Sequence, residues 1–275
     1  MVVKCRITVN LLSLKVRVRV EFSKYEGLGN DFVVIERPEI DARDAKKICD
    51  RRLGIGADGV LLLEPGAVAP YRMTVWNADG SNAEMCGNGL RCIVRHLQRT
   101  VPDLTTRFSI ETGAGLLWVS WDHNAITAEL GTVVDHGPLD VDVDESTLSG
   151  RLISTGNPHF VLFGKFEASY MAHYGPLLET LPIFPDGVNV SFARRLSGTS
   201  VELTVWERGC GLTQACGTGA CATVVAGWLE SKLEANSAVQ VDLPGGSLEI
   251  SGAPENIIMR GPANFVFSGV WPSST

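Results

Sequence analysis

The sequence predicts a mixed α/β protein (of the α+β type) made of two similar halves, each rich in strands and each with one central helix. Two Gly-rich loops carry this prediction, because residues 77–92 and residues 206–221 both contain Cys-Gly-Asn/Thr-Gly. Good helix formers follow each loop. We therefore expect Cys86 and Cys216 each to stand at the N-terminal end of a helix.

The spacing of a second pair of landmarks indicates an internal duplication. The Gly-Asn turns that end at Asn30 and Asn157 lie 127 positions apart, and each leads into an apolar strand pattern. Cys86 and Cys216 lie 130 positions apart. Two unrelated pairs of landmarks with nearly the same separation in sequence indicate an internal repeat.

In the first half, apolar runs between turn residues predict a series of strands joined by two helices. One helix is expected at 41–51 with Asp41 as its cap, and the other directly after Cys86. A Gly-rich turn at 27–30 should feed the first of the strands, which are expected at 32–35, 60–64, 71–76, 107–112, 115–121 and 125–130.

The second half repeats this pattern after residues 131–150, a stretch rich in Asp, Gly and Pro that we expect to be a linker. Helices are expected at 166–178 and after Cys216, and strands at 160–163, 188–193, 200–206, 238–243, 247–251, 257–261 and 265–270. Residues 1–21 are expected to form an N-terminal extension, either as one extra edge strand or loosely held.

Composition excludes several classes of function. A net charge of −7 argues against a nucleic-acid surface, which needs clustered Lys and Arg. No apolar run approaches the roughly 20 residues of a membrane span, and we find no export signal. Seven cysteines are an odd number in a chain too large to need disulfides. We therefore expect free thiols and a cytoplasmic location.

The position of the two cysteines suggests acid–base chemistry. Unpaired N–H groups and the macrodipole favour negative charge at a helix start, so a thiol there should ionise more easily than free cysteine, whose pKa is about 8.5. Three other uses fit less well. Structural zinc sites use Cys-x2-Cys with closely spaced partners, a single nucleophile leaves one loop without a role, and redox pairs are normally local.

A two-base proton transfer uses both loops. One thiolate removes a proton from carbon and the other thiol delivers a proton to the opposite face, which inverts a stereocentre. The amides after each cysteine can bind a carboxylate at the two helix starts and stabilise the charge that develops on deprotonation. The scheme requires one ionised and one protonated thiol, so their titrations are coupled.

At these residues the sequence resembles the diaminopimelate epimerase family, over about residues 22–269. The motifs are Gly27-Leu-Gly-Asn-Asp-Phe, Asn77-Ala-Asp-Gly-Ser, Cys86-Gly-Asn-Gly, Gly156-Asn-Pro-His, Glu207-Arg-Gly and Ala215-Cys-Gly-Thr-Gly-Ala. The resemblance implies two pseudo-symmetric domains, each a mixed sheet wrapped around a central helix. With the last strand returned to the first domain, the domains comprise residues 22–130 plus 263–275, and residues 131–262.

The same resemblance implies roles for individual residues. Cys86 and Cys216 are the acid–base thiols, and Asn30 lies near the reacting centre. The reacting carboxylate is held by the backbone N–H groups of Gly87, Asn88, Gly217 and Thr218. The rest of the substrate is held by Asn77, Asn157, Asn189, Glu207 and Arg208. The implied activity is a cofactor-independent epimerisation of LL- and meso-2,6-diaminopimelate by a homodimer, with a small-molecule substrate and no metal.

Other notable residues have ordinary structural explanations. We expect Cys92 and Cys221 in the core, His159 to support neighbouring groups rather than act as a base, and Asp58 and Asp79 to cap turns. No lysine lies in a phosphate-binding context, so pyridoxal phosphate is not indicated. Two alternatives remain open: a racemase of the same fold that acts on another amino acid, and a relative that only binds amino acids.

Overall fold

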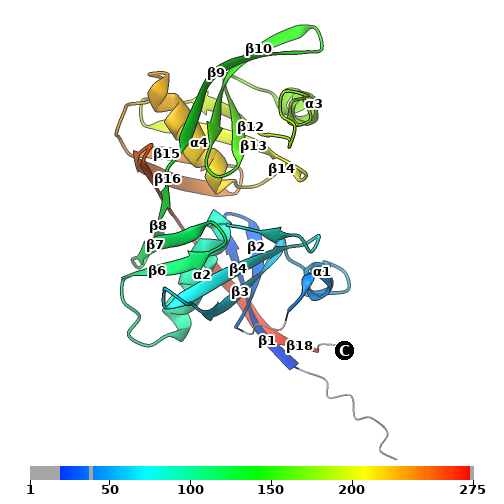
Figure 1. The fold of residues 1–275 in the computed structure, drawn as a ribbon, viewed down its shortest axis with the longest axis vertical. Coiled ribbons are helices and arrows are strands. Elements are labelled where there is room, and N and C mark those ends of the chain that lie inside the picture. Colours follow the sequence, from blue (N-terminus) through cyan, green and yellow to red (C-terminus); the bar gives the residue numbers. More distant parts are fainter. Residues whose placement is uncertain (1–18, 37–39, 273–275) are drawn as a thin grey trace, which may run out of the picture.

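A computed structural model describes residues 19–36 and 40–272 of the chain, and it forms two lobes joined near their middle (Figure 1). Most of the predicted N-terminal extension, residues 1–18 with Cys5, lies outside the described residues. The part that is described belongs to a regular strand, because β1 begins at Arg19.

The first lobe contains α1 (Ala42–Cys49) and α2 (Gly87–Thr100). Asp41 caps α1 as predicted, accepting hydrogen bonds from the backbone N–H groups of Arg43 and Asp44. The strands are β1 (Arg19–Gly27), β2 (Asn30–Ile35), β3 (Gly59–Pro65), β4 (Tyr71–Asn77), β5 (Asn82–Ala83), β6 (Arg107–Thr112), β7 (Gly115–Trp121) and β8 (Ile126–Gly131).

The second lobe contains α3 (Ala168–Glu179) and α4 (Gly217–Leu229). Its strands are β9 (Val134–Val143), β10 (Ser146–Ser154), β11 (Pro158–Phe163), β12 (Asn189–Arg195), β13 (Ser200–Glu207), β14 (Gly211–Leu212), β15 (Val239–Leu243), β16 (Gly246–Ala253) and β17 (Asn256–Gly261). The chain then returns to the first lobe as β18 (Asn264–Pro272).

The prediction of a linker at residues 131–150 is wrong, because β9 and β10 form a long antiparallel hairpin there. Leu139, Val141 and Val143 alternate with aspartates along β9, and Val141 and Val143 are buried. The abundance of Asp, Gly and Pro in this stretch concealed its period-two pattern. A register shift near Gly137 accommodates the Gly-Pro pair in the strand.

The pairing of strands confirms the duplication. In the first lobe β1–β2 is antiparallel, β2–β3 parallel, β3–β4 antiparallel, β4–β6 parallel, and β6–β7–β8 antiparallel. The second lobe repeats this order with β10–β11, β11–β12, β12–β13, β13–β15 and β15–β16–β17. Each lobe thus has one mixed sheet of the same topology.

Two further pairings exchange strands between the lobes. The last strand, β18, pairs with β1, as expected for a chain that returns to its first domain, and β9 pairs with β10 in the corresponding place (Figure 1). Antiparallel pairing of β8 with β17 joins the two sheets directly. The exact limits of the two domains stay a prediction.

Each sheet wraps around its cysteine-headed helix. On α4 all but a few side chains are buried, and the helix is apolar on every face, as expected for a helix enclosed by its own sheet. Helix α2 is buried from Gly87 to Val94. Helices α1 and α3 instead cover the outer faces of the sheets, over separate small cores. One continuous apolar cluster contains residues of α2, α4 and both lobes.

Candidate active site

Cys86 and Cys216 occupy the positions predicted for them, as the N-cap residues of α2 and α4. In each lobe a strand ends at a polar residue, Asn77 on β4 and Glu207 on β13. A tight turn and a two-residue strand then bring the chain back to the helix start. The repeated strand–turn–helix unit therefore gives both cysteines the same local geometry.

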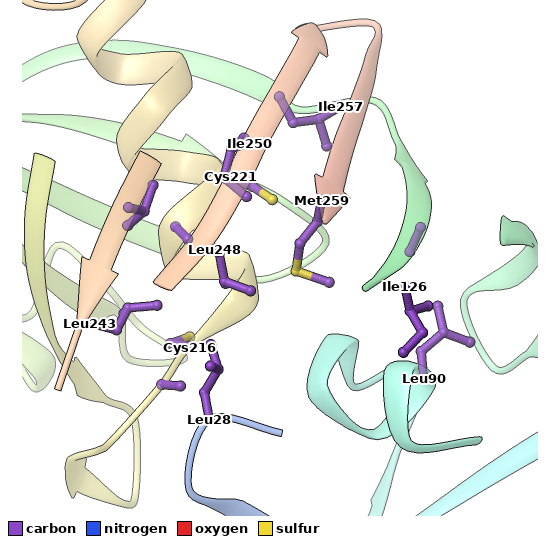
Figure 2. Close-up of a cluster of buried hydrophobic side chains, with 14 of the residues drawn as sticks. Leu28, Leu90, Ile126, Cys216, Cys221, Leu243, Leu248, Ile250, Ile257 and Met259 are labelled. Atoms are coloured by element: carbon purple, nitrogen blue, oxygen red, sulfur yellow. The ribbon is translucent and has the colours of Figure 1, made fainter. Parts of the chain in front are cut away.

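The two helix starts lie against one another. The Met259 side chain, from β17, fills the space between them: a Cβ atom added to Gly87 would lie 3.0 Å from Met259 Cε, and one added to Gly217 would lie 2.9 Å from its sulfur. Figure 2 shows Met259 and Cys216 in this region. Asn88 crosses the junction, donating from Nδ2 to the carbonyl oxygen of Ala215 at 3.1 Å. A side chain at either glycine would require Met259 to move.

Cys86 is partly buried, and its Sγ accepts a hydrogen bond from the Gly89 N–H at 3.4 Å. Burial raises the pKa of the Cys86 thiol, while the Gly89 N–H acts in the opposite direction. The negative charge of Glu207 also raises this pKa, and the positive charge of Arg91 lowers it. The expected easier ionisation at a helix start is therefore wrong here, because desolvation outweighs the N–H groups.

The Cys216 side chain is 4% exposed, and the carboxylate of Glu207 lies near its thiol. Burial raises the pKa of the Cys216 thiol well above its ordinary value, and the nearby Glu207 carboxylate raises it further. Its Sγ lies 3.4 Å from Thr218 Oγ1, and the Thr218 hydroxyl and the Gly219 N–H lower its pKa without offsetting burial and Glu207. The two thiols are therefore not equivalent: Cys86 is the easier one to ionise.

Asn30 reaches the site through a polar chain in the first lobe. Its Oδ1 accepts from Asn88 Nδ2 at 3.1 Å, and its Nδ2 donates to Asp58 Oδ2 at 2.8 Å. Arg51 in turn holds both Asp58 and Asp31. Asp58 thus does more than cap a turn, because it fixes the amide of Asn30, which sets the orientation of Asn88.

In the second lobe, Asn157, His159 and Thr218 form a cluster. His159 Nε2 lies 3.1 Å from Thr218 Oγ1 and 3.3 Å from Asn157 Oδ1. The His159 ring is completely buried. Burial, followed by the positive charge of Arg208, lowers its pKa to about 3. A neutral imidazole in this place supports Thr218, as expected for a residue that positions its neighbours.

The remaining predicted residues come from both lobes, and Glu207 faces the Cys216 thiol. Asn189 is buried and bridges Pro158 O to the backbone N–H of Arg208. The exposed Arg208 side chain bonds Asp186 O. Exposed Asn77 bonds Ser81 Oγ, within a turn that Asp79 closes as predicted. Glu207 accepts from Thr213, and burial raises the pKa of its carboxyl.

Cys92 and Cys221 are completely buried, as predicted for core residues. Sequence reasoning overlooked Met259 and Arg91. Met259 had no local signal, because only the fold brings β17 to the helix starts. Arg91 had a local signal, because it is a charged residue in a stretch of predicted helix whose neighbours are mostly apolar or small.

Among residues 19–36 and 40–272, no group of three or more His, Cys, Asp or Glu side chains is arranged to hold a metal ion. Within the same ranges, no helix is both long and apolar enough to span a bilayer.

The duplicated two-domain α/β architecture also occurs in solved structures of other proteins. The crystal structure of a probable proline racemase from Agrobacterium radiobacter superposes with a TM-score of 0.72 at 13% identity, covering 91% of this chain and 92% of that one. At this identity the likeness concerns the fold alone.

Among proteins of this architecture, the chain belongs to the diaminopimelate epimerase family. The family model described as diaminopimelate epimerase matches residues 22–138 and 151–266, one match in each half. A diaminopimelate epimerase from Desulforudis audaxviator is 41% identical over 91% of this chain and 99% of its own length. One from Carboxydothermus hydrogenoformans is 42% identical over 90% of this chain and 98% of its own length.

The buried His159 predicts a loss of stability in mild acid. The unfolded chain binds a proton at this residue below about pH 6.5, whereas the folded protein does so only near pH 3. Its contribution to the free energy of unfolding is complete above about pH 6.5 and falls by about 1.4 kcal/mol per pH unit below it. Urea unfolding at pH 7 and pH 5 should show a smaller pH effect in His159→Gln than in the wild type. The exposed His123→Gln serves as control, and an equal pH effect in all three proteins would contradict the assignment.

Proposed function

We propose that this protein is an isomerase, a diaminopimelate epimerase that interconverts LL- and meso-2,6-diaminopimelate for lysine and peptidoglycan precursor synthesis. Membership of the family supports this assignment. The observation that carries it is structural: Cys86 and Cys216 cap two helices whose first residues are in contact through Met259 and Asn88.

The chemistry is a two-base inversion at the α-carbon. One thiolate takes the α-proton, and the opposite thiol gives its proton to the other face, so that the second sulfur ends as the thiolate. In α2 the Leu90 N–H bonds Cys86 O and the Gly89 N–H bonds Cys86 Sγ. No backbone oxygen within α2 pairs with the N–H groups of Gly87 and Asn88, of which the second also faces the Cys86 sulfur, so we assign them to the reacting carboxylate together with those of Gly217 and Thr218 in α4.

The two sulfurs have different surroundings, and from these we assign which thiol is ionised before the substrate reacts. Glu207 raises the pKa of both thiols, but it also hydrogen-bonds Cys216, whereas the charge of Arg91 lowers the pKa of Cys86; we therefore assign the thiolate to Cys86 and the protonated thiol to Cys216. A thiolate at one cysteine raises the pKa of the other thiol, so the two cysteines together carry a single proton. The thiols and helix starts supply both acid–base groups and anion stabilisation, so this chemistry requires no pyridoxal phosphate.

The distal end of the substrate is assigned to the second lobe. Arg208 has no carboxylate within ion-pair distance among the described residues, and its fork suits bidentate binding of a second carboxylate. Asn189 holds its backbone in place. Glu207 suits an ammonium group, and Asn77 and Asn157 supply further polar contacts. The free state of every cysteine among the described residues supports a reducing, cytoplasmic location.

The protein is proposed to be a homodimer that pairs through β18. This strand is at the edge of its sheet, contains no charged residue, and exposes Val266, Phe267 and Val270 by 49%, 42% and 52%. Edge strands of monomers usually carry charges that block pairing. The corresponding edge strand β9 does so, with aspartates at 135, 140 and 142.

Replacing either acid–base cysteine should abolish epimerisation. Cys86→Ala and Cys216→Ala should each lower kcat by about 10²- to 10⁴-fold, the usual contribution of a general acid or base. The measurement is conversion of purified LL isomer, with exchange of the α-hydrogen in deuterated solvent. Cys92→Ala and Cys221→Ala, in the same helices, should stay active. Full activity of both Cys86→Ala and Cys216→Ala would exclude the mechanism.

Replacing Arg208 should weaken binding of the distal carboxylate. Arg208→Gln is expected to lose about 10- to 100-fold in kcat/KM, mostly through KM, because one charge-assisted pair is removed. Arg195→Gln, an exposed arginine at the end of β12, is the control. A loss confined to kcat, or faster turnover of an amino acid with one carboxylate by the wild type, would favour a racemase with another substrate.

A charge placed on the apolar edge should separate the proposed dimer. Light scattering coupled to size exclusion should give the mass of two chains for the wild type and of one chain for Val266→Lys. Val134→Lys, equally exposed at 49% but on the charged edge of β9, should behave as the wild type. A wild-type protein that elutes as one chain would refute the proposal.

A further inference from the structure

Arg91 is the largest side chain that is completely buried among the described residues. It lies on α2, close to two glycines from other elements: a Cβ atom added to Gly27 or to Gly261 would lie 3.4 Å from its guanidinium nitrogens. The chain therefore leaves space for a charged group inside a largely apolar core. Such burial is rare for arginine and costly unless the charge is compensated.

The guanidinium group connects three parts of the molecule. Its Nη2 donates to Asn88 Oδ1 at 2.8 Å, and its Nη1 approaches Gly87 O at 3.4 Å, both at the start of α2. Its Nη1 also lies 3.3 Å from Met259 Sδ, between the helix starts. Its Nε donates to Pro262 O at 3.0 Å, on the crossover through which the chain passes from β17 to β18.

These contacts determine the orientation of Asn88. Because Oδ1 accepts from Arg91, Nδ2 must face Asn30 Oδ1 and Ala215 O, and the latter carbonyl precedes Cys216. Without this partner, Oδ1 would be left buried without a donor, a cost that the side chain could avoid only by giving up its two Nδ2 bonds. Arg91 thus supports, through Asn88, the contact between the two cysteine loops.

The charge of Arg91 has no carboxylate within ion-pair distance among the described residues. The titratable groups that face it are Cys86 and Cys92 on its own helix, Cys221 on α4 and Glu26 on β1. Arginine keeps its proton in proteins. A fixed positive charge without an ionic partner therefore stands behind Cys86, whose other charged neighbour is Glu207 on β13.

We propose that Arg91 is a positioning residue for the epimerisation: it orients Asn88 between the two cysteine loops, ties that contact to the crossover at residues 262–263, and places a buried positive charge against Gly87 O, next to Cys86. The inference rests on the proposed function. Both properties of the side chain are needed, since the planar fork provides the orientation and the charge provides the electrostatic support.

Arg95 lies one turn after Arg91 on α2, and its substitution is the control for a role that is only structural. Its Nε donates to Ala263 O at 2.9 Å, so it holds the same crossover by the same kind of bond. Its hydrogen bonds reach neither Asn88 nor Gly87. If Arg91 only fastened the crossover, Arg95→Met would reproduce the effects of Arg91→Met.

The experiment compares Arg91→Met, Arg91→Lys and Arg95→Met with the wild type by two measurements. One is the pH profile of kcat/KM with LL-diaminopimelate. The other is the pH dependence of alkylation of Cys86 by iodoacetamide, followed by mass spectrometry of its peptide, which requires no turnover. Thermal unfolding of each variant establishes that it is folded.

Loss of the charge in Arg91→Met should lower kcat/KM about 100-fold. It should also move the acid limb of the profile and the alkylation midpoint of Cys86 upward by about one pH unit, since a nearby cation no longer favours the thiolate. Arg91→Lys should keep both midpoints but lose about tenfold in kcat/KM, because lysine lacks the fork. Arg95→Met should change neither quantity.

An unchanged alkylation midpoint in Arg91→Met, or equal effects in Arg95→Met, would overturn the proposal. If Arg91→Met does not fold, Arg91→Lys provides the test. Full activity of Arg91→Lys, or a pH midpoint of Cys86 alkylation that moves by one unit in this variant, would contradict the proposal. A wild-type protein that alkylates as expected but does not epimerise diaminopimelate would refute the proposed function while leaving the assignment of the charge to Cys86 intact.

Discussion

The contact between the N-termini of α2 and α4 is the constraint on which the rest of the structure depends. Two helix starts carry partial charges of the same sign, so their approach is unfavourable unless something negative lies between them. Gly87 and Gly217 leave room for the Met259 side chain at this junction. In the proposed mechanism, the substrate carboxylate would supply the negative charge that makes the approach favourable.

Burial is the main influence on the pKa of the two thiols. Desolvation raises the pKa of both, so the helix starts alone do not produce a thiolate. The differences around the two sulfurs are small and local: a buried guanidinium near Cys86, and a hydroxyl and a hydrogen-bonded carboxylate at Cys216. The duplicated fold thus provides matching geometry, while individual side chains make the two thiols unequal.

Sequence patterns predicted most of the strands, the Asp41 cap and both cysteine-headed helices, because each depends on residues near in the chain. The β9–β10 hairpin was missed, since its turn-forming residues hide an alternation visible only at Leu139, Val141 and Val143. Contacts set by tertiary structure could not be predicted either. Met259 between the helix starts, Asp58 holding Asn30, and Arg91 bonding Pro262 O each join residues far apart in sequence.

The exchange of β9 and β18 between the lobes has a consequence for how such a chain could arise. Each repeat ends in a strand that completes the sheet of the other repeat. A polypeptide containing only one repeat would leave its first strand without that neighbour, and two copies could satisfy each other only by swapping their last strands. The present chain has the architecture of such an intertwined pair fused end to end, after which the two copies were free to acquire different side chains around a shared centre.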